Sequence, residues 1–527
     1  MKVLNKSSLF INTIKYLKPI QVYYRLYYFL LNNFFNKKIS KTVFRERDLI
    51  HWISKTNMPS SYSEMHTTFV FLNKKHSFSN KINWNFDSYG KLWTYNLNYF
   101  DFLNQGELNV ETGINLIYNF INEDNITTGK ESYPISLRSI NWIKFLSKNQ
   151  VKNELIDTYL YGDYDILLNN LEFHILGNHL LENAFSLLFG AYYFQDEKLY
   201  TKAKKILFSQ LNEQILNDGA HFELSPMYHQ IMLFRILDCI NLVELNTWKN
   251  REILLFLKEK ASFMLSWLNE VTFKNGDIPI VNDSAKNIAL TSNELFLYAK
   301  RIGLISKNLD LSDSGYRMFR NNNFELFVDV GNVGPDYQPG HVHSDTLSFI
   351  LYLNNEPLFV DTGISTYEKN ITRQKERQTS AHNTVVINNQ DQTQVWGGFR
   401  VAKRAFVKKV KEGVDFVEAE HDGYKNIGVK HSRRFLIKKS AIIISDIIIN
   451  NSNYSQTAYF HLHPSVKNFI IHDNSIIIEN EITMIFTGTD IIINKKLYEY
   501  ATEFNKTEKA VVFKITFKSN LETSIKL

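Results

Sequence analysis

The pattern of apolar and polar positions divides the chain into a helical half and a strand-rich half. From about residue 105 to 305, apolar residues recur at helical intervals in runs such as LRSINWIKFLSKN and LLENAFSLLFGAYYF. After Phe324, β-branched residues crowd short runs such as HNTVVINN and SAIIISDIIINN, which Asn-Asn and Asp-Gly pairs separate. We therefore predict helical hairpins followed by an antiparallel β domain of roughly 200 residues.

The boundaries follow from these changes of pattern, and the length of 527 residues suffices for more than one core. The sharpest change falls at Asp310–Gly315. We predict an N-terminal helical or extension segment at 1–80, a helical domain at 81–315 and a β domain at 316–527.

The first 35 residues are aromatic and basic. Lys15, Lys18 and Arg25 interrupt every apolar run, no small-residue cleavage site follows, and no stretch is long enough to span a bilayer. We expect a non-exported, cytoplasmic protein, with the periplasm as the alternative. The N-terminal helix is a candidate for peripheral contact with a membrane surface.

Composition and charge narrow the partners. Hydrophobic residues make up 44% of a chain with only 9 Pro, which is typical of a folded protein. The net charge of +6 favours anionic partners, but no basic run or nucleic-acid motif focuses it. We expect no nucleic-acid partner and consider an acidic polysaccharide suitable. The single cysteine, Cys239, excludes an intrachain disulfide, and its apolar surroundings predict burial.

A group of histidines and aspartates surrounds a predicted strand pair at 347–360. His341 and His343 are two residues apart, so an extended backbone directs both to one face. The hairpin returns Asp361 towards His343, and His382 opens a later apolar strand. His343, Asp361 and His382 therefore form a candidate site for a Zn²⁺-type ion.

Two segments of the helical half carry further candidate chemistry. In LEFHILGNHLLEN, His179 and Glu182 share a helix face, although a simple polar helix face also explains them. In DGAHFELSPMYHQ, Ser225 and Pro226 predict a helix start that places Tyr228 in the first turn. The helix N-terminus could stabilise a phenolate there, although ordinary packing also explains a tyrosine.

The ordered set of motifs resembles one family. HVHSD, FVDTG and SAHNTV, with GNHLLEN, SPMYH and WTYNLNYF upstream, are similar to segments of the heparinase II/III-like polysaccharide lyases, which include heparinase II, heparinase III and some alginate lyases. The resemblance implies an α+β multidomain fold, with an N-terminal (α/α) helical toroid followed by a C-terminal antiparallel β-sandwich.

The resemblance also implies catalytic roles for Asn178, His179, Tyr228 and His341. β-Elimination removes the C5 proton of a uronate and breaks the bond at O4. Asn178 would neutralise the carboxyl group, Tyr228 or His179 would take the proton, and Tyr228 would return one to the leaving oxygen. By the same resemblance, a zinc ion held by the three metal candidates would be mainly structural.

Substrate-binding candidates complete the site. They are Arg138, Asn141, Trp142, Glu182, Trp396 and Arg400. Guanidinium groups suit carboxylates and rings suit sugar faces, although a helix surface explains the first three equally well.

Three functions remain open from the sequence. The first is a lyase acting on an acidic glycan such as a glycosaminoglycan, alginate or capsular polysaccharide. The second is a uronyl C5-epimerase that uses the same site, and the third is a non-catalytic glycan-binding or assembly protein. The sequence leaves open the sugar, its sulfation, endo or exo cleavage, the metal and the oligomeric state.

Overall fold

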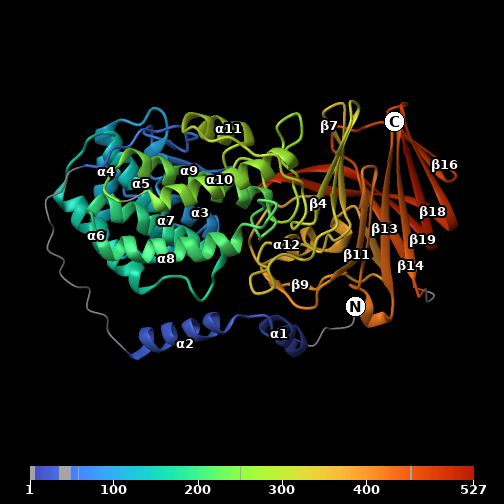
Figure 1. Ribbon diagram of the computed structural model, residues 1–527, viewed down its shortest axis with the longest axis horizontal. Coiled ribbons are helices and arrows are strands. Elements are labelled where there is room, and N and C mark those ends of the chain that lie inside the picture. Colours follow the sequence, from blue (N-terminus) through green and yellow to red (C-terminus); the bar gives the residue numbers. More distant parts are fainter. Residues whose placement is uncertain (1–5, 35–48, 57, 250, 451–453) are drawn as a thin grey trace.

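The computed structural model describes residues 6–34, 49–56, 58–249, 251–450 and 454–527. A helical domain and a β domain lie side by side along the long axis, and two N-terminal helices run beneath them (Figure 1). This arrangement confirms the predicted fold class of a helical toroid followed by an antiparallel β-sandwich.

The helices carry the following bounds: α1 Lys6–Ile14, α2 Pro19–Phe34, α3 Lys91–Tyr99, α4 Val110–Ile121, α5 Ser132–Lys148, α6 Glu154–Asn169, α7 Gly177–Phe194, α8 Glu197–Gln214, α9 Pro226–Leu245, α10 Glu252–Val271, α11 Ser292–Arg301 and α12 Ile371–Glu376.

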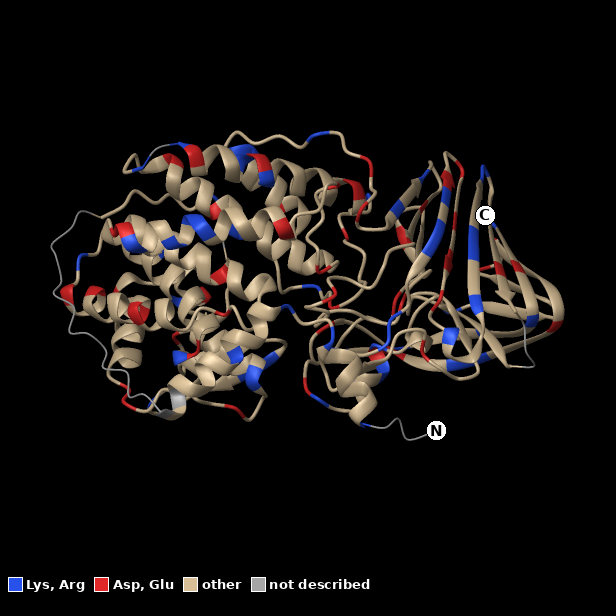
Figure 2. Cartoon of the chain, turned by 60° about the horizontal axis from the view of Figure 1, so that its bottom comes forward, with Lys and Arg blue, Asp and Glu red and all other residues tan. Residues whose placement is uncertain are grey.

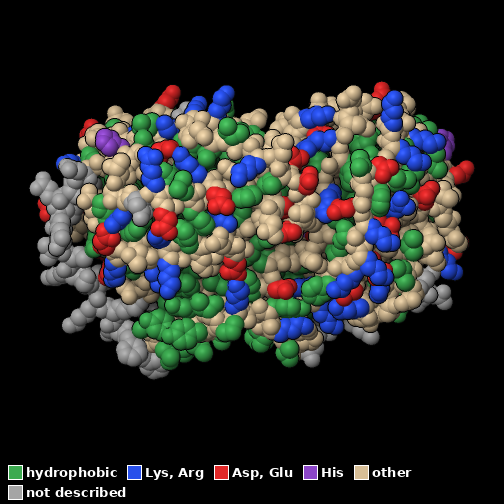
Figure 3. Space-filling model, in the orientation of Figure 1, with side chains coloured by type: hydrophobic (Ala, Val, Ile, Leu, Met, Phe, Trp, Pro, Cys, Tyr) green, Lys and Arg blue, Asp and Glu red, His purple; other side chains and the backbone are tan. Residues whose placement is uncertain are grey.

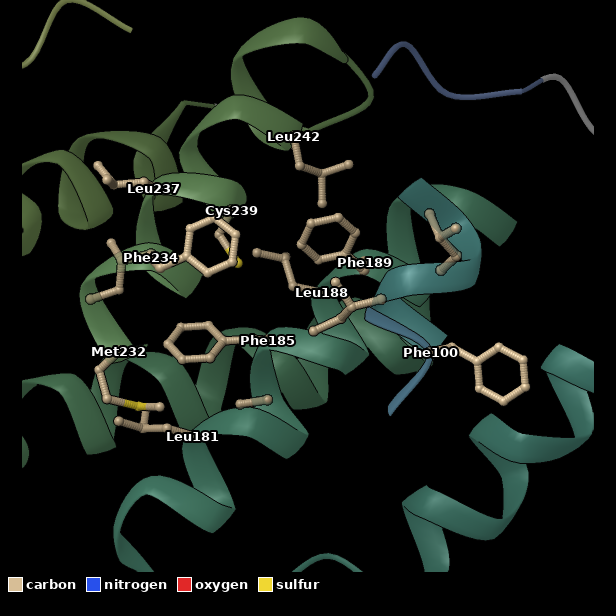
Figure 4. Close-up of a cluster of buried hydrophobic side chains, with 14 of the residues drawn as sticks. Phe100, Leu181, Phe185, Leu188, Phe189, Met232, Phe234, Leu237, Cys239 and Leu242 are labelled. Carbon is tan, nitrogen blue, oxygen red and sulfur yellow. The ribbon is translucent and has the colours of Figure 1, made fainter. Parts of the chain in front are cut away.

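Helix α7 lies at the centre of the helical domain, because it packs against α5, α8 and α9. Apolar residues all round such a helix are expected when every side meets another element. Figure 4 shows Phe185 and Phe189 of α7 facing Phe234 of α9, with Cys239 buried beside them as predicted. This packing fixes the direction of α7 and hence the position of the residues at its N-terminus.

The strands carry the following bounds: β1 Tyr62–Ser63, β2 Thr68–Phe71, β3 Lys74–Ser77, β4 Tyr316–Arg320, β5 Phe324–Asp329, β6 Phe349–Leu353, β7 Glu356–Phe359, β8 Val385–Ile387, β9 Val395–Trp396, β10 Arg400–Val401, β11 Val407–Gly413, β12 Phe416–His421, β13 Lys430–Lys438, β14 Ala441–Ile449, β15 Gln456–His461, β16 Phe469–His472, β17 Ser475–Ile478, β18 Ile482–Glu503 and β19 Lys506–Lys526.

Strands β1 to β3 form a small sheet that belongs to the core of the helical domain. The Tyr62 and Phe69 rings both contact Phe102, which lies after α3. Trp93 of α3 donates its indole N–H to the carbonyl of Lys74 at 3.1 Å. The boundary predicted at residue 80 therefore has no counterpart in the packing.

Two large antiparallel sheets and the small β9–β10 hairpin form the β domain. One large sheet has four strands in the order β4-β5-β6-β7. The other runs β11-β12-β13-β14-β19-β18-β17-β16, with β15 also paired to β19 and β8 paired to β15. Side chains such as Phe349, Phe435 and Phe460 pack between the sheets. The sandwich core therefore lies between them.

The four-stranded sheet also forms the wall that faces the helical domain. All six residues of β5 are buried. Leu326 joins the sandwich core, whereas its neighbour Phe327 belongs to a cluster with Trp267 of α10. Alternate residues of β5 thus pack on the sandwich core and on the helical domain, because successive side chains of a strand point to opposite faces. This contact fixes how the two domains sit against each other.

Among the described residues, no helix has both the length and the apolar character needed to cross a lipid bilayer.

Candidate active site

Asn178 lies at the start of α7. The residue before it, Gly177, has a backbone conformation that glycine accommodates best. Gly177 has a φ of +58°, and a Cβ built there would lie 2.5 Å from Oε1 of Glu223. The backbone N–H of Asn178 donates to Glu223 Oε1 at 3.0 Å, and its Nδ2 donates to Oε2 at 2.9 Å. Asn178 is therefore held in one orientation by a buried carboxylate.

His179 is paired with a carboxylate just outside its own helix. Its Nδ1 lies 2.9 Å from Oε1 of Glu172, and Asn183 donates to the other Glu172 oxygen. Because a carboxylate only accepts, Nδ1 carries a proton. Burial lowers the pKa of His179, but Glu172, with smaller effects from Glu223 and Glu182, outweighs burial and raises it.

Tyr228 is the third residue of α9, as predicted, because Ser225 caps this helix and Pro226 is its first residue. Its ring stacks on that of His341 with 3.9 Å between ring centroids, and its hydroxyl lies 3.4 Å from that of Tyr367. Burial, with the nearby charge of Asp283, raises the pKa of Tyr228. The raised pKa means that Tyr228 keeps its proton near neutral pH.

Asp283, in the loop between α10 and α11, organises the β-domain side. His341 Nδ1 lies 2.9 Å from Asp283 Oδ2, and His343 Nε2 lies 3.0 Å from Oδ1. Arg373 of α12 donates to both oxygens at 2.5 and 2.6 Å. Burial opposes ionisation, but Arg373 and the histidines hold the pKa of Asp283 well below its usual range.

Glu223 joins the two sides of the site. Besides its bonds to Asn178, its Oε2 lies 3.5 Å from Nε2 of His341. His341 stacks on Tyr228 in turn. The structure therefore brings residues from α7, α9 and the β domain to one place, and His179 adjoins it in α7.

A pocket of about 140 Å³ opens beside Tyr228. Most of its lining is aromatic or aliphatic, and its polar residues include Asp101 and Arg235. Arg235 donates through Nε to Glu182 at 3.1 Å, but its buried Nη1 has no partner among the described residues. Arg235 thus lines the pocket with a guanidinium group that is only partly hydrogen-bonded.

The three predicted metal ligands converge. Ligand atoms of His343, Asp361 and His382 all lie within 4.8 Å of one another, and all three residues are buried. His343 Nδ1 and His382 Nε2 have no hydrogen-bond partner among the described residues. Buried nitrogens without partners are costly, and two imidazoles with a carboxylate suit zinc, so the residues present fit such an ion.

Four predicted substrate contacts are internal instead. Arg138 and Trp142 are fully buried in α5, where Arg138 pairs with Asp163. Glu182 is fully buried against Arg235, and Asn141 donates to Asp101 Oδ1 at 2.7 Å. None of the four has surface to offer a glycan. We correct their roles to support of the core and of the pocket residues Arg235 and Asp101.

The other two predicted contacts lie on the β9–β10 hairpin, which packs against α1. The indole N–H of Trp396 donates to Thr13 at 3.1 Å, and the Arg400 guanidinium lies 4.9 Å from the Trp396 ring. Arg400 is exposed. A glycan contact for Trp396 and Arg400 stays a prediction.

Sequence reasoning missed four residues of the site. Glu172 and Glu223 lie inside the two segments already selected, and Arg235 follows Tyr228 by seven residues, two turns along the same helix face. The sequence could therefore have identified these three residues as candidates. Asp283, in IVNDSA, has no local signal, because only the fold brings it to His341.

Comparisons with known proteins identify the family and the fold. A model of the heparinase II/III N-terminus matches residues 131–300, and a model of the heparinase II/III-like C-terminal domain matches residues 306–527. A heparin-sulfate lyase from Bacteroides stercoris is 27% identical over 316 residues, covering 54% of this chain and 46% of the relative. One from Bacteroides thetaiotaomicron is 23% identical over 341 residues, covering 56% and 47%.

The chain therefore spans about half the length of these curated relatives. Among solved structures, a heparinase III matches with a TM-score of 0.66 and 18% identity, covering 85% of this chain and 80% of the other. A heparan sulfate lyase from Pedobacter heparinus matches with a TM-score of 0.55 and 16% identity, covering 86% and 79%. These structures show the shared fold.

Proposed function

Because the chain belongs to the heparinase II/III-like family, we propose that it is a polysaccharide lyase that cleaves an acidic, uronic-acid-containing polysaccharide by β-elimination. The observation that carries this proposal is the convergence of Asn178, Tyr228 and His341 around Glu223. The names of the curated relatives, both heparin-sulfate lyases, support the same reaction and suggest a glycosaminoglycan.

The amide of Asn178 would bind the uronate carboxyl group. Its Nδ2 donates to both oxygens of Glu223 in the structure, so the substrate carboxylate, an acceptor of the same kind, would take over one of these two bonds. A donor at that position stabilises the charge that develops when the C5 proton leaves. Glu223 then serves to position Asn178 and His341.

Proton transfer would be shared between Tyr228 and His179. Tyr228 retains its proton, so it suits the general acid that protonates the leaving O4 oxygen. The side chain of His179 is 28% exposed and, when neutral, has a free Nε2 that can accept the C5 proton. Glu172 would stabilise the imidazolium that forms.

Zinc is part of the proposal as a mainly structural ion. His343, Asp361 and His382 would hold it, and its charge would neutralise the buried carboxylate. His343 is two residues from His341, so the ion would steady the segment that carries His341.

The experiment measures the absorbance of a 4,5-unsaturated uronate product over heparan sulfate, hyaluronan, alginate and capsular polysaccharide. Tyr228→Phe is the test variant, and Tyr459→Phe on β15 is the matched control. A rise that disappears only in Tyr228→Phe supports a lyase and identifies its substrate.

Two results would contradict the proposal. Exchange of C5 protons with deuterated solvent, without any rise in absorbance, would identify a uronyl C5-epimerase. Binding of a glycan with neither signal would identify a non-catalytic glycan-binding protein.

A further inference from the structure

Helix α2 contacts the protein through a narrow side and directs most of its large apolar side chains towards solvent. Gln21 is buried and donates to the carbonyl of Ile175 at 3.0 Å, and the hydroxyl of Tyr28 donates to the carbonyl of Leu171 at 2.6 Å. Lys18, just before the helix, pairs with Glu213 of α8. Tyr24 also stacks on Phe173, so the attachment is partly aromatic. Most large apolar side chains of the helix nevertheless face away from the protein, which is the reverse of an ordinary surface helix.

The opposite side of these helices exposes large apolar side chains. Exposed fractions reach 59% for Tyr23, 60% for Leu26 and 61% for Phe29. The full exposed set is Phe10, Ile11 and Ile14 on α1, and Ile20, Val22, Tyr23, Leu26, Tyr27, Phe29 and Leu30 on α2. Figure 3 shows hydrophobic side chains gathered along the lower edge, where Figure 1 places α2. We name this set the N-terminal apolar face.

The sequence segment that carries this face has charges of a single sign. Residues 1–45 contain nine basic residues and no acidic one, whereas the rest of the chain has a net charge of −3. Lys6 on α1, Lys15 just after it and Arg25 on α2 are exposed. Elsewhere acidic and basic residues are interspersed over both domains (Figure 2). An apolar face within a purely basic segment is complementary to an apolar surface that carries negative charge.

We propose that the N-terminal apolar face docks on the surface of an anionic lipid bilayer. Aliphatic side chains such as Leu26 would enter the acyl boundary, tyrosines would lie at headgroup depth, and the basic residues would bind anionic headgroups. A two-fold dimer through the same face would place one basic segment against another, which charge repulsion opposes.

Docking would place the candidate active site close to the bilayer. Ile175, which accepts the bond from Gln21, lies three residues before Asn178, and Gln21 also contacts the carbonyl of Tyr337 at 3.4 Å. The membrane-facing helix is thus attached to segments that carry the site. This inference goes beyond the proposed reaction and does not depend on it.

Sedimentation of the full chain with vesicles tests the proposal. We expect binding to vesicles containing phosphatidylglycerol to exceed binding to phosphatidylcholine vesicles roughly tenfold or more, and to weaken as salt rises. The double variant Leu26→Glu/Phe29→Glu should reduce binding to the anionic vesicles at least about tenfold. Leu255→Glu is the matched control, because Leu255 is 67% exposed on α10, far along the chain.

Unfolding midpoints close to wild type show that both variants fold. The proposal is overturned if the wild type stays in the supernatant with anionic vesicles, or if both variants lose binding equally. It is also overturned if sedimentation velocity shows a dimer that the double variant dissociates while vesicles bind neither protein. In that case a second copy covers the face. Formation of the unsaturated uronate product from a soluble glycan is a separate measurement. The membrane proposal and the lyase proposal can therefore fail independently.

Discussion

At the scale of single residues, carboxylates decide what the histidines of the site can do. Glu172 holds His179, Asp283 holds His341, and Glu223 joins His341 to Asn178. Each carboxylate accepts a hydrogen bond from an imidazole or an amide and so fixes its orientation. In the candidate site, buried carboxylates therefore hold the histidines and Asn178 in fixed orientations.

The pair of His179 and Glu172 predicts a pH effect. Glu172 raises the pKa of His179 above 6.5, so a neutral base forms only above that raised value, and kcat/KM should fall as pH drops through it. Glu172→Gln removes the carboxylate, and burial then lowers the pKa. The acidic limb of the kcat/KM profile should move to lower pH. Glu244→Gln, in an exposed pair with Lys258, is the control. An unmoved limb would show that His179 is not the base.

Arg235 and Arg138 predict different effects on binding. Arg235 lines the pocket, so Arg235→Met should raise KM by roughly 10- to 100-fold, and because it leaves Glu182 buried without its partner it should also cost about 3–5 kcal/mol of unfolding free energy. Arg138→Met leaves Asp163 buried without its partner and should cost about 3–5 kcal/mol as well, but it should leave KM of the folded protein unchanged. Steady-state kinetics and urea unfolding measure the two effects. Equal KM values in wild type and Arg235→Met would remove Arg235 from the substrate site.

At the scale of elements, the start of α7 is the most demanding position. The turn before it combines positive φ angles at Leu176 and Gly177, and Glu223 occupies the space beside Gly177. The helix itself is held by α5, α8 and α9. A rigid helix with a constrained first turn can hold Asn178 and His179 in place without contacts from the substrate.

Gly177→Ala should therefore affect activity more than folding. The added Cβ meets Glu223 Oε1 at 2.5 Å and the positive φ strains it, so we expect a cost of about 1–3 kcal/mol and loss of most lyase activity. Gly162→Ala is the matched control, because nothing lies within 4 Å of its Cβ in α6. The control should be neutral or more stable by about 0.5–1 kcal/mol. Thermal unfolding and activity assays separate the two, and full activity in Gly177→Ala would contradict the role of this turn.

At the scale of the whole molecule, the site exists only where the two domains meet. Asn178 and Tyr228 come from the helical domain, while His341 comes from the β domain. The four-stranded sheet that carries Phe327 towards Trp267 fixes the distance between them. Any change that loosens this contact should separate the catalytic candidates without altering them.

Loss of a metal ligand is a second prediction at this scale. His382→Ala should abolish bound zinc, as measured by elemental analysis, and lower the unfolding midpoint. The free energy of unfolding should fall by about 4 kcal/mol when the free zinc concentration is a thousand times its dissociation constant. A chelator should reproduce the effect in the wild type but not in His382→Ala, and His463→Ala should retain the metal. Absence of zinc from the wild type would refute the assignment.

The sequence by itself determined what depends on neighbouring residues. Patterns that act over a few residues identified the helical half and the strand-rich half of the chain. In the same way, the Ser225-Pro226 helix start placed Tyr228 in the first turn of α9. The motif order identified the family, and two-residue spacing with a hairpin was enough to predict that His343 and Asp361 converge.

Only the tertiary structure decided what each side chain faces. Periodicity indicates that a helix has a polar side but not what meets it, so Arg138 and Glu182 looked like cleft residues and proved to be buried in ion pairs. For the same reason, the outward direction of most large apolar side chains of α2 could not be read from its residues. Burial and charge pairing depend on contacts between elements far apart in the chain, and local sequence does not encode those contacts separately.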